Sequence, residues 1–164
     1  MSLGVFFALA EEDRIKLRTL SRPQDMRHFL EQLEEHYFAN ETEWLAECDK
    51  AWDPIHRALG GGDLTVKPAR YPFSHVVLGG EELPGAGYTM ILKTPQQVSA
   101  AAAAIAPVTH EQLRNWYFSI NSETYEQGLS EEDWEYTWEH FVEVRNLFLK
   151  AASAQRAVLF TYDE

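Results

Sequence analysis

Residues 48–62 read CDKAWDPIHRALGGG and hold the densest mixture of ionisable and aromatic side chains in the chain. Three consecutive glycines close the stretch, and glycine is the usual residue where a helix ends. Apolar residues of this region recur at intervals of three and four, namely Leu45, Cys48, Trp52, Ile55 and Leu59. This spacing predicts one buried helical face, and Asp49, Asp53 and His56 follow the same spacing along its edge.

Pro54 interrupts this helical pattern, because proline lacks an N–H and disfavours the helical conformation of the residue before it. Two interpretations remain. In the first, a longer helix runs from Thr42 and bends at Pro54. In the second, Asp53 is the N-cap, Pro54 is the first helical residue and a short helix ends at Gly60. Asp53 would then bind backbone amides and would not be available for chemistry.

His56 is the best single candidate for chemistry. Beside Asp49 or Asp53, which are the weaker catalytic candidates, it would act as an oriented general base or a metal ligand. A metal would need another ligand from elsewhere, such as His75, and no paired-ligand spacing supports one. We therefore predict no metal and no cofactor. The structural alternative is a histidine that bonds a carboxylate or a backbone carbonyl at the edge of the core.

Asp49, Lys50, Trp52 and His56 form the predicted ligand-binding set, in a pocket beneath the glycine-rich loop 79–87. Each also has a structural interpretation: Asp49 as a helix cap, Lys50 as a solvated charge and Trp52 as a core residue. Cys48 lies on the apolar face about two helical turns from His56, so we predict a structural thiol.

The chain of 164 residues is 45% hydrophobic and 13% aromatic, which is typical of one globular domain spanning residues 1–164. A single cysteine excludes an internal disulfide and favours a cytoplasmic location. No apolar stretch approaches the length that crosses a membrane.

The net charge of −12 argues against non-specific nucleic-acid binding, which depends on neutralising phosphates. Residues 123–143 carry eight acids and no Lys or Arg. One interpretation is a set of solvated helix faces. The other is an acidic surface that attracts a basic protein partner.

Local patterns along the chain predict an α+β fold, with a small mixed or antiparallel sheet covered by several helices. Strands are expected at 3–9, 73–78, 88–92 and 157–162. One helix is expected from residue 11 to about residue 20. Others are expected to begin after Ser21, after Thr94 with an end near Pro107, after Thr109 and after Ser130. Ser21, Thr94 and Thr109 each begin a capping-box pattern, and Ser130 precedes three acids that suit a helix N-terminus. Leu149 is expected on the apolar face of the last helix.

The order of short motifs resembles the YfbM-like family, small bacterial proteins of unknown function. The central motif is D-K-x-W-x-x-x-H-x-x-L-G at residues 49–60. The flanking pieces are GVFF at 4–7, VLGG at 77–80, TPxxV at 94–98 and AVLF at 157–160. The chain departs from the pattern at Pro54 and at Gly61, where a Leu-Thr-Gly ending is usual. The resemblance implies an α+β fold and carries over no catalytic residue.

Two functional hypotheses follow. The first is a non-catalytic binding protein, a monomer or homodimer, that regulates or neutralises a basic protein partner through its acidic surface. The alternative is a small enzyme or small-molecule-binding protein with a pocket around Asp49, Trp52 and His56. The sequence contains no complete catalytic constellation, so binding is the favoured hypothesis.

Overall fold

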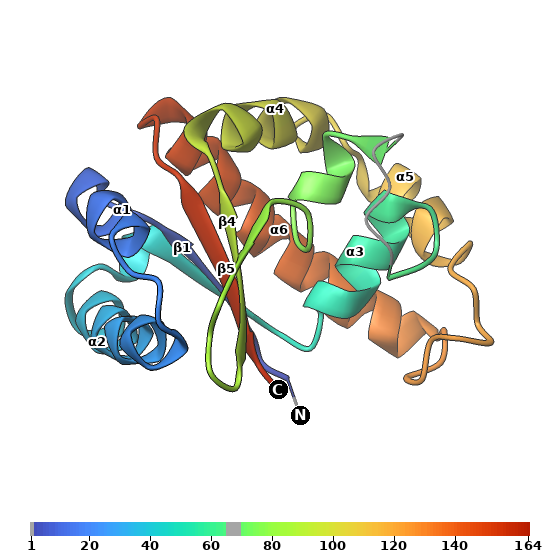
Figure 1. Ribbon diagram of the computed structural model, residues 1–164. Helices are drawn as coiled ribbons and strands as arrows, with labels where there is room; N and C mark the ends of the chain where they lie inside the picture. Colours follow the sequence, from blue (N-terminus) through green and yellow to red (C-terminus); the bar gives the residue numbers. More distant parts are fainter. Residues whose placement is uncertain (1, 65–69) are drawn as a thin grey trace.

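The computed structural model describes residues 2–64 and 70–164. It contains one five-stranded sheet with the order β2-β1-β5-β4-β3, in which every neighbouring pair is antiparallel (Figure 1). The strands are β1 (Gly4–Ala8), β2 (Leu45–Asp49), β3 (Glu81–Leu83), β4 (Tyr88–Lys93) and β5 (Val158–Asp163). The chain ends enter adjacent strands, so both termini lie at one end of the sheet (Figure 1).

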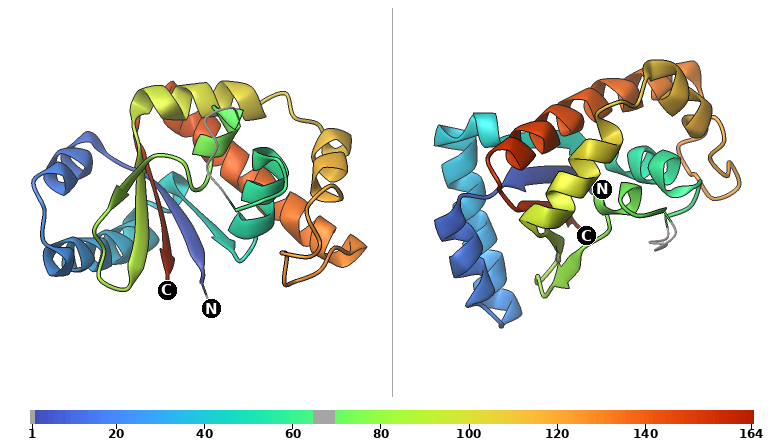
Figure 2. Two further views of the ribbon diagram at one scale, coloured as in Figure 1. Left: turned by 45° about the vertical axis from the view of Figure 1, so that its right-hand side comes forward. Right: turned by 90° about the horizontal axis from the view of Figure 1, so that it is seen from above.

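Helices cover both faces of this sheet, as the two views in Figure 2 show. One face packs against α1 (Glu11–Arg18) and α2 (Pro23–Asn40). The opposite side carries α3 (Trp52–Gly60), α4 (Pro95–Ile105), α5 (His110–Tyr117) and α6 (Glu131–Ser153). Short 3-10 helices of the described residues include η1 (Thr42–Trp44) and η3 (Phe73–His75). The predicted α+β fold, with an antiparallel sheet covered by helices, is confirmed.

Alternation along the first strand divides the apolar residues into two cores. Phe7 and Leu9 point toward α2, whereas Phe6 and Ala8 point toward α6. Successive side chains of a strand point to opposite faces, so a continuously apolar strand supplies both cores. Leu3–Leu9 was predicted as a buried strand for this reason, and β1 confirms it.

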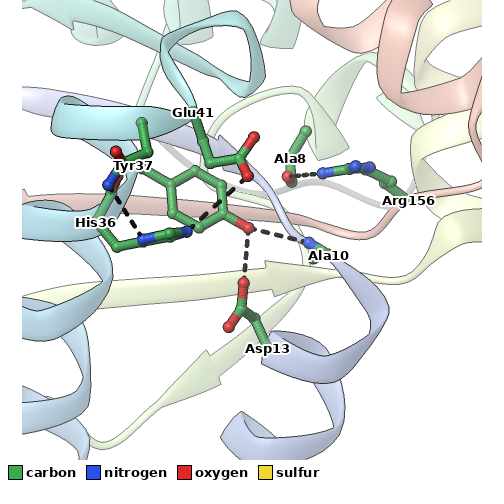
Figure 3. Close-up of polar contacts among 8 residues, drawn as sticks. Ala8, Ala10, Asp13, His36, Tyr37, Glu41 and Arg156 are labelled. Carbon is green, nitrogen blue, oxygen red and sulfur yellow. Dashed lines mark hydrogen bonds and ion pairs between the residues drawn. The ribbon is translucent and has the colours of Figure 1, made fainter.

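Tyr37 ties the first two helices to the end of β1 (Figure 3). Its hydroxyl donates to Asp13 Oδ2 at 2.8 Å and accepts from the Ala10 backbone N–H at 3.0 Å. Arg156 donates to the nearby Ala8 carbonyl at 3.2 Å (Figure 3). Burial raises the pKa of the Tyr37 phenol, and this cluster stabilises the packing of α1 and α2 on the sheet.

The first interpretation of this region, a helix that runs from Thr42 and bends at Pro54, is wrong in its first half, and the second is wrong about where the short helix starts. Leu45–Asp49 is strand β2, and helix α3 begins only at Trp52, with Ala51 as its N-cap. Asp53 is therefore the second helical residue and not the cap. The end at Gly60 is confirmed, and Gly61 follows with a φ of 96°, a left-handed conformation that glycine adopts without steric cost.

Four smaller predictions are also corrected. Residues 73–78 form a 3-10 helix and turns instead of a strand, and the loop 79–87 contains the short strand β3. Ser21 does not cap α2, whose N-cap is Arg22 without a side-chain bond. Leu149 is 38% exposed. The capping boxes at Thr94 and Thr109 and the cap at Ser130 are confirmed.

Candidate functional site

A cavity of about 400 Å³ lies at one end of the sheet, between strands β1, β2 and β5 and helix α2. Four carboxylates line it, from Glu34, Glu47, Asp49 and Asp163, and we call it the carboxylate cavity. The other lining residues are Leu3, Gly4, Val5, Phe38, Tyr88 and Thr161. Among the described residues that line it, none is Lys, Arg or His.

Strand pairing brings two of the carboxylates, Glu47 and Asp163, to one face. Asp49 also lies on β2 and borders the cavity, but a bulge opposite Gly4 interrupts the alternation there, and its carboxylate bonds Tyr136 of α6. Val5 is the cross-strand partner of both Glu47 and Thr161, and Asp163 follows Thr161 by two residues. The face is the one that α2 covers, and Glu34 of that helix supplies the fourth carboxylate.

The surroundings of Glu34 disfavour its charged form. Burial first, and then the charges of Glu31 and Asp163, raise the pKa of Glu34. Arg27 lies beside the cavity with its guanidinium 5.7 Å from the centre of the Tyr88 ring, but it is paired with Glu31 at 3.1 Å. The cavity thus presents uncompensated negative charge.

Apolar surface borders these carboxylates. Leu3 is 52% exposed and Phe38 is 40% exposed, and both line the cavity together with the half-buried Val5. A lysine or arginine side chain has a matching construction, with an apolar stem and a cationic head. The cavity is therefore suited chemically to such a side chain.

Asp49 also borders a second, smaller cavity of about 230 Å³ on the other side of the β2 end. Lys50, Tyr125, Gln127, Asp133 and Tyr136 complete its lining. The Lys50 backbone N–H donates to the Tyr136 hydroxyl at 3.1 Å. Burial, followed by a hydrogen bond with Asp49, raises the pKa of Tyr136 to about 12.

Asp49 has a φ of 47°, which only a few per cent of residues other than glycine adopt. This left-handed residue ends β2 and turns the chain toward α3. The predicted candidates Asp49 and Lys50 thus share a polar cavity, at a point where the backbone conformation is unusual.

His56 and Trp52 lie elsewhere. His56 is 1% exposed, and its Nδ1 accepts a hydrogen bond from the Leu78 backbone N–H at 3.5 Å. The Trp52 indole stacks on Tyr162 with ring centres 4.5 Å apart and donates to the Ser2 carbonyl at 3.0 Å. Neither residue lines the two cavities that Asp49 borders.

Asp53 and Cys48 have structural surroundings. Asp53 forms an ion pair with Arg57, which is 5% exposed and also donates to Thr124 at 2.9 Å. Burial raises the pKa of Asp53, an effect that Arg57 opposes. Cys48 is fully buried, and this burial raises the pKa of its thiol.

Three residues of the carboxylate cavity escaped the sequence analysis, namely Glu34, Glu47 and Asp163. Each comes from a different element, so no local motif connects them. Glu47 and Asp49 alternate with the buried Ala46 and Cys48, and this period-two pattern was the available signal for a half-buried strand.

No group of three or more His, Cys, Asp or Glu side chains within residues 2–64 and 70–164 is arranged to hold a metal ion. In the same residues, no helix combines the length and the apolar character that spanning a bilayer demands.

Comparisons with known proteins identify the fold. The profile of a family described as a domain of unknown function (DUF1877) matches residues 1–161. A crystal structure of YfbM, a protein of unknown function from Escherichia coli, superposes with a TM-score of 0.66 and 17% sequence identity, covering 98% of this chain and 99% of that one. No curated protein matches. The resemblance to the YfbM-like family is confirmed.

Proposed function

The chain belongs to the DUF1877 family, whose description assigns no activity, and from the site itself we propose that it is a binding protein for a basic protein partner. The carboxylate cavity receives a lysine or arginine side chain of that partner. Residues 1–164 act as one domain in this role.

One observation carries the proposal: four carboxylates converge on a cavity whose described lining includes no cationic side chain. Holding like charges close together without compensation is unfavourable, and a bound cation reduces this repulsion. The net charge of −12 adds a long-range field that attracts a basic partner and speeds its association.

The cavity matches both parts of a lysine side chain. Its ammonium group would pair with Glu47 and Asp163, while its apolar stem would cover Leu3 and Phe38. The raised pKa of Glu34 means that this carboxyl holds a proton to higher pH than usual. A cation favours its ionised form, so binding should weaken as the pH falls through the pKa of Glu34.

A peptide titration tests this proposal. The probe is a short capped peptide of alternating lysine and threonine, and calorimetry measures its affinity at low salt. The double variant Glu34→Gln/Glu47→Gln should bind about tenfold more weakly, because each partly exposed ion pair contributes up to about 1 kcal/mol. The control is Glu12→Gln/Glu123→Gln, which removes the same charge from two exposed residues outside the cavity.

The control variant should retain nearly the affinity of the natural protein. Equal weakening in both double variants would mean that only the overall field attracts the peptide, which would contradict a site in the cavity. Unfolding midpoints of all three proteins, measured in the same buffer, establish that each is folded.

A further inference from the structure

Strand β2 lies at the edge of the sheet, and β1 is its only strand partner within residues 2–64 and 70–164. Hydrogen bonds near the ends of β1 show which of its residues face β5. The Leu9 N–H donates to the Ala157 carbonyl at 2.9 Å, and the Leu3 N–H donates to Asp163 Oδ1 at 2.8 Å. The backbone N–H and C=O groups of successive residues point to opposite edges of a strand. In β1, those of odd-numbered residues therefore point toward β5 and those of even-numbered residues toward β2.

This alternation determines which groups of β2 point outward. Phe6 is the cross-strand partner of Ala46, so the backbone groups of Ala46 face β1. The N–H and C=O of the next residue, Glu47, therefore point away from the sheet. In the described chain no backbone hydrogen bond outside the sheet reaches Glu47, whereas the Leu45 N–H already donates to Thr42. Glu47 thus forms the open edge.

A groove runs along this edge, between β2 and α6. A cavity of about 500 Å³ there is lined by Glu47, Trp138, Glu139, His140, Val142 and Glu143. We call it the outer groove. Glu47 lines both the outer groove and the carboxylate cavity, so these two hollows meet at the open edge. A third hollow, lined by Glu43, Leu45 and Glu143 among others, continues along the strand.

Two cations near this edge are already engaged. Lys150 binds Glu43 at 3.3 Å and lies 4.4 Å from the centre of the Trp44 ring. Arg145 donates to the Val108 carbonyl at 2.8 Å. Burial lowers the pKa of His140, which favours its neutral form. Glu47, Glu139 and Glu143 therefore give the outer groove a negative character.

We propose that the partner binds as an extended segment that adds a sixth strand to the sheet along β2. This inference rests on the proposed function and specifies its geometry. The backbone of the segment bonds the N–H and C=O of Glu47, and its alternate side chains point to opposite faces. Lysine or arginine side chains on one face enter the carboxylate cavity, and those on the other face approach Glu139 and Glu143.

Backbone methylation separates strand addition from charge attraction. The test compares the alternating lysine–threonine peptide with two N-methylated versions of it. One is methylated at every odd-numbered residue and the other at every even-numbered residue. Methylation removes N–H donors and leaves the charge unchanged. Strand addition predicts that at least one methylated version binds about tenfold more weakly, the effect of losing one or two hydrogen bonds. The Glu47 amide should also exchange its hydrogen more slowly when the unmethylated peptide is bound.

A pair of variants tests the same edge from the protein side. Glu47→Gln removes the charge and keeps the N–H, whereas Glu47→Pro removes both. Proline is tolerated on an edge strand where its nitrogen faces solvent. Strand addition predicts that the proline variant binds the peptide about threefold to tenfold more weakly than the glutamine variant. Circular dichroism establishes that both variants are folded, and the methylated peptides decide the question if the proline variant is not.

The outcomes distinguish this inference from the proposed function. Equal affinity for all the peptides, with the cavity double variant still weakened, would overturn strand addition and leave the binding of a basic partner intact. No binding of any peptide would overturn the proposed function itself. Unchanged exchange of the Glu47 amide in the bound state would also contradict strand addition.

Discussion

At the scale of single residues, Lys93 shows most clearly how burial changes chemistry. Its side chain is fully buried, and Nζ donates to the Val77 carbonyl at 2.6 Å, close to the Phe160 ring. Burial lowers the pKa of Lys93 to about 7. The unfolded chain holds this proton up to a pKa of about 10.4, so keeping the amine buried costs more free energy as the pH falls from there toward 7.

We therefore expect Lys93→Met to stabilise the protein in a pH-dependent way. The gain in unfolding free energy should be larger at pH 7 than at pH 10, by on the order of 3 kcal/mol, because methionine has no proton to lose. Urea unfolding of both proteins at the two pH values measures it. Parallel stability profiles for the two proteins would show that the buried amine does not titrate in this range.

The predicted candidate residues separate in the structure. Asp49 and Lys50 do line cavities, but His56 belongs to the core, where the Leu78 amide binds its ring. The helical spacing of Asp49 and His56 suggested a shared edge, and the strand that ends at Asp49 removes that spacing. Glu34 and Asp163 could not be predicted, because only tertiary packing brings them together.

At the scale of elements, two similar helix-start patterns behave differently. Thr94 Oγ1 accepts from the Gln97 N–H at 3.1 Å, and Gln97 Oε1 accepts from the Thr94 N–H at 2.9 Å. Ser21 shows the same sequence pattern, but α2 begins one residue later and its cap makes no side-chain bond. The pattern is therefore necessary but not sufficient for a capping box.

This contrast provides a matched pair of variants. Thr94→Ala should lower the unfolding free energy by about 1 kcal/mol, because it leaves the Gln97 N–H in the first turn of α4 without its partner. Ser21→Ala should change it by less than about 0.5 kcal/mol, as is usual for an exposed residue that makes no capping bond. Thermal or urea unfolding measures both. A loss of similar size in the serine variant would contradict the cap assignment of α2.

Elements with strong local signals were predictable, and those that depend on distant partners were not. Capped helices and the apolar strands β1 and β5 were found within a few residues of their observed bounds. Strand β2 was mistaken for helix because Leu45, Cys48 and Trp52 fit a helical spacing. Its conformation comes from pairing with β1, about forty residues earlier in the chain, which overrides a local pattern.

At the scale of the whole molecule, charge and topology act together. The sheet buries its apolar surface under helices on both faces and leaves β2 at one edge. Acidic side chains surround that edge, from α2 on one side and from α6 on the other. The sequence predicted an acidic surface over residues 123–143, but the carboxylate cavity draws its charges from other elements. Net charge is a property of composition, whereas its concentration in a cavity depends on the fold.

The central claim is that the carboxylate cavity is where a cationic partner binds. Titrating ¹⁵N-labelled protein with the lysine–threonine peptide and following each amide by NMR tests it most directly. We predict that the largest shifts fall on Glu34, Glu47, Asp49 and Asp163, and that they diminish with added salt. Shifts concentrated instead on the acidic first turn of α6, at Glu131 and Glu132, would contradict the claim.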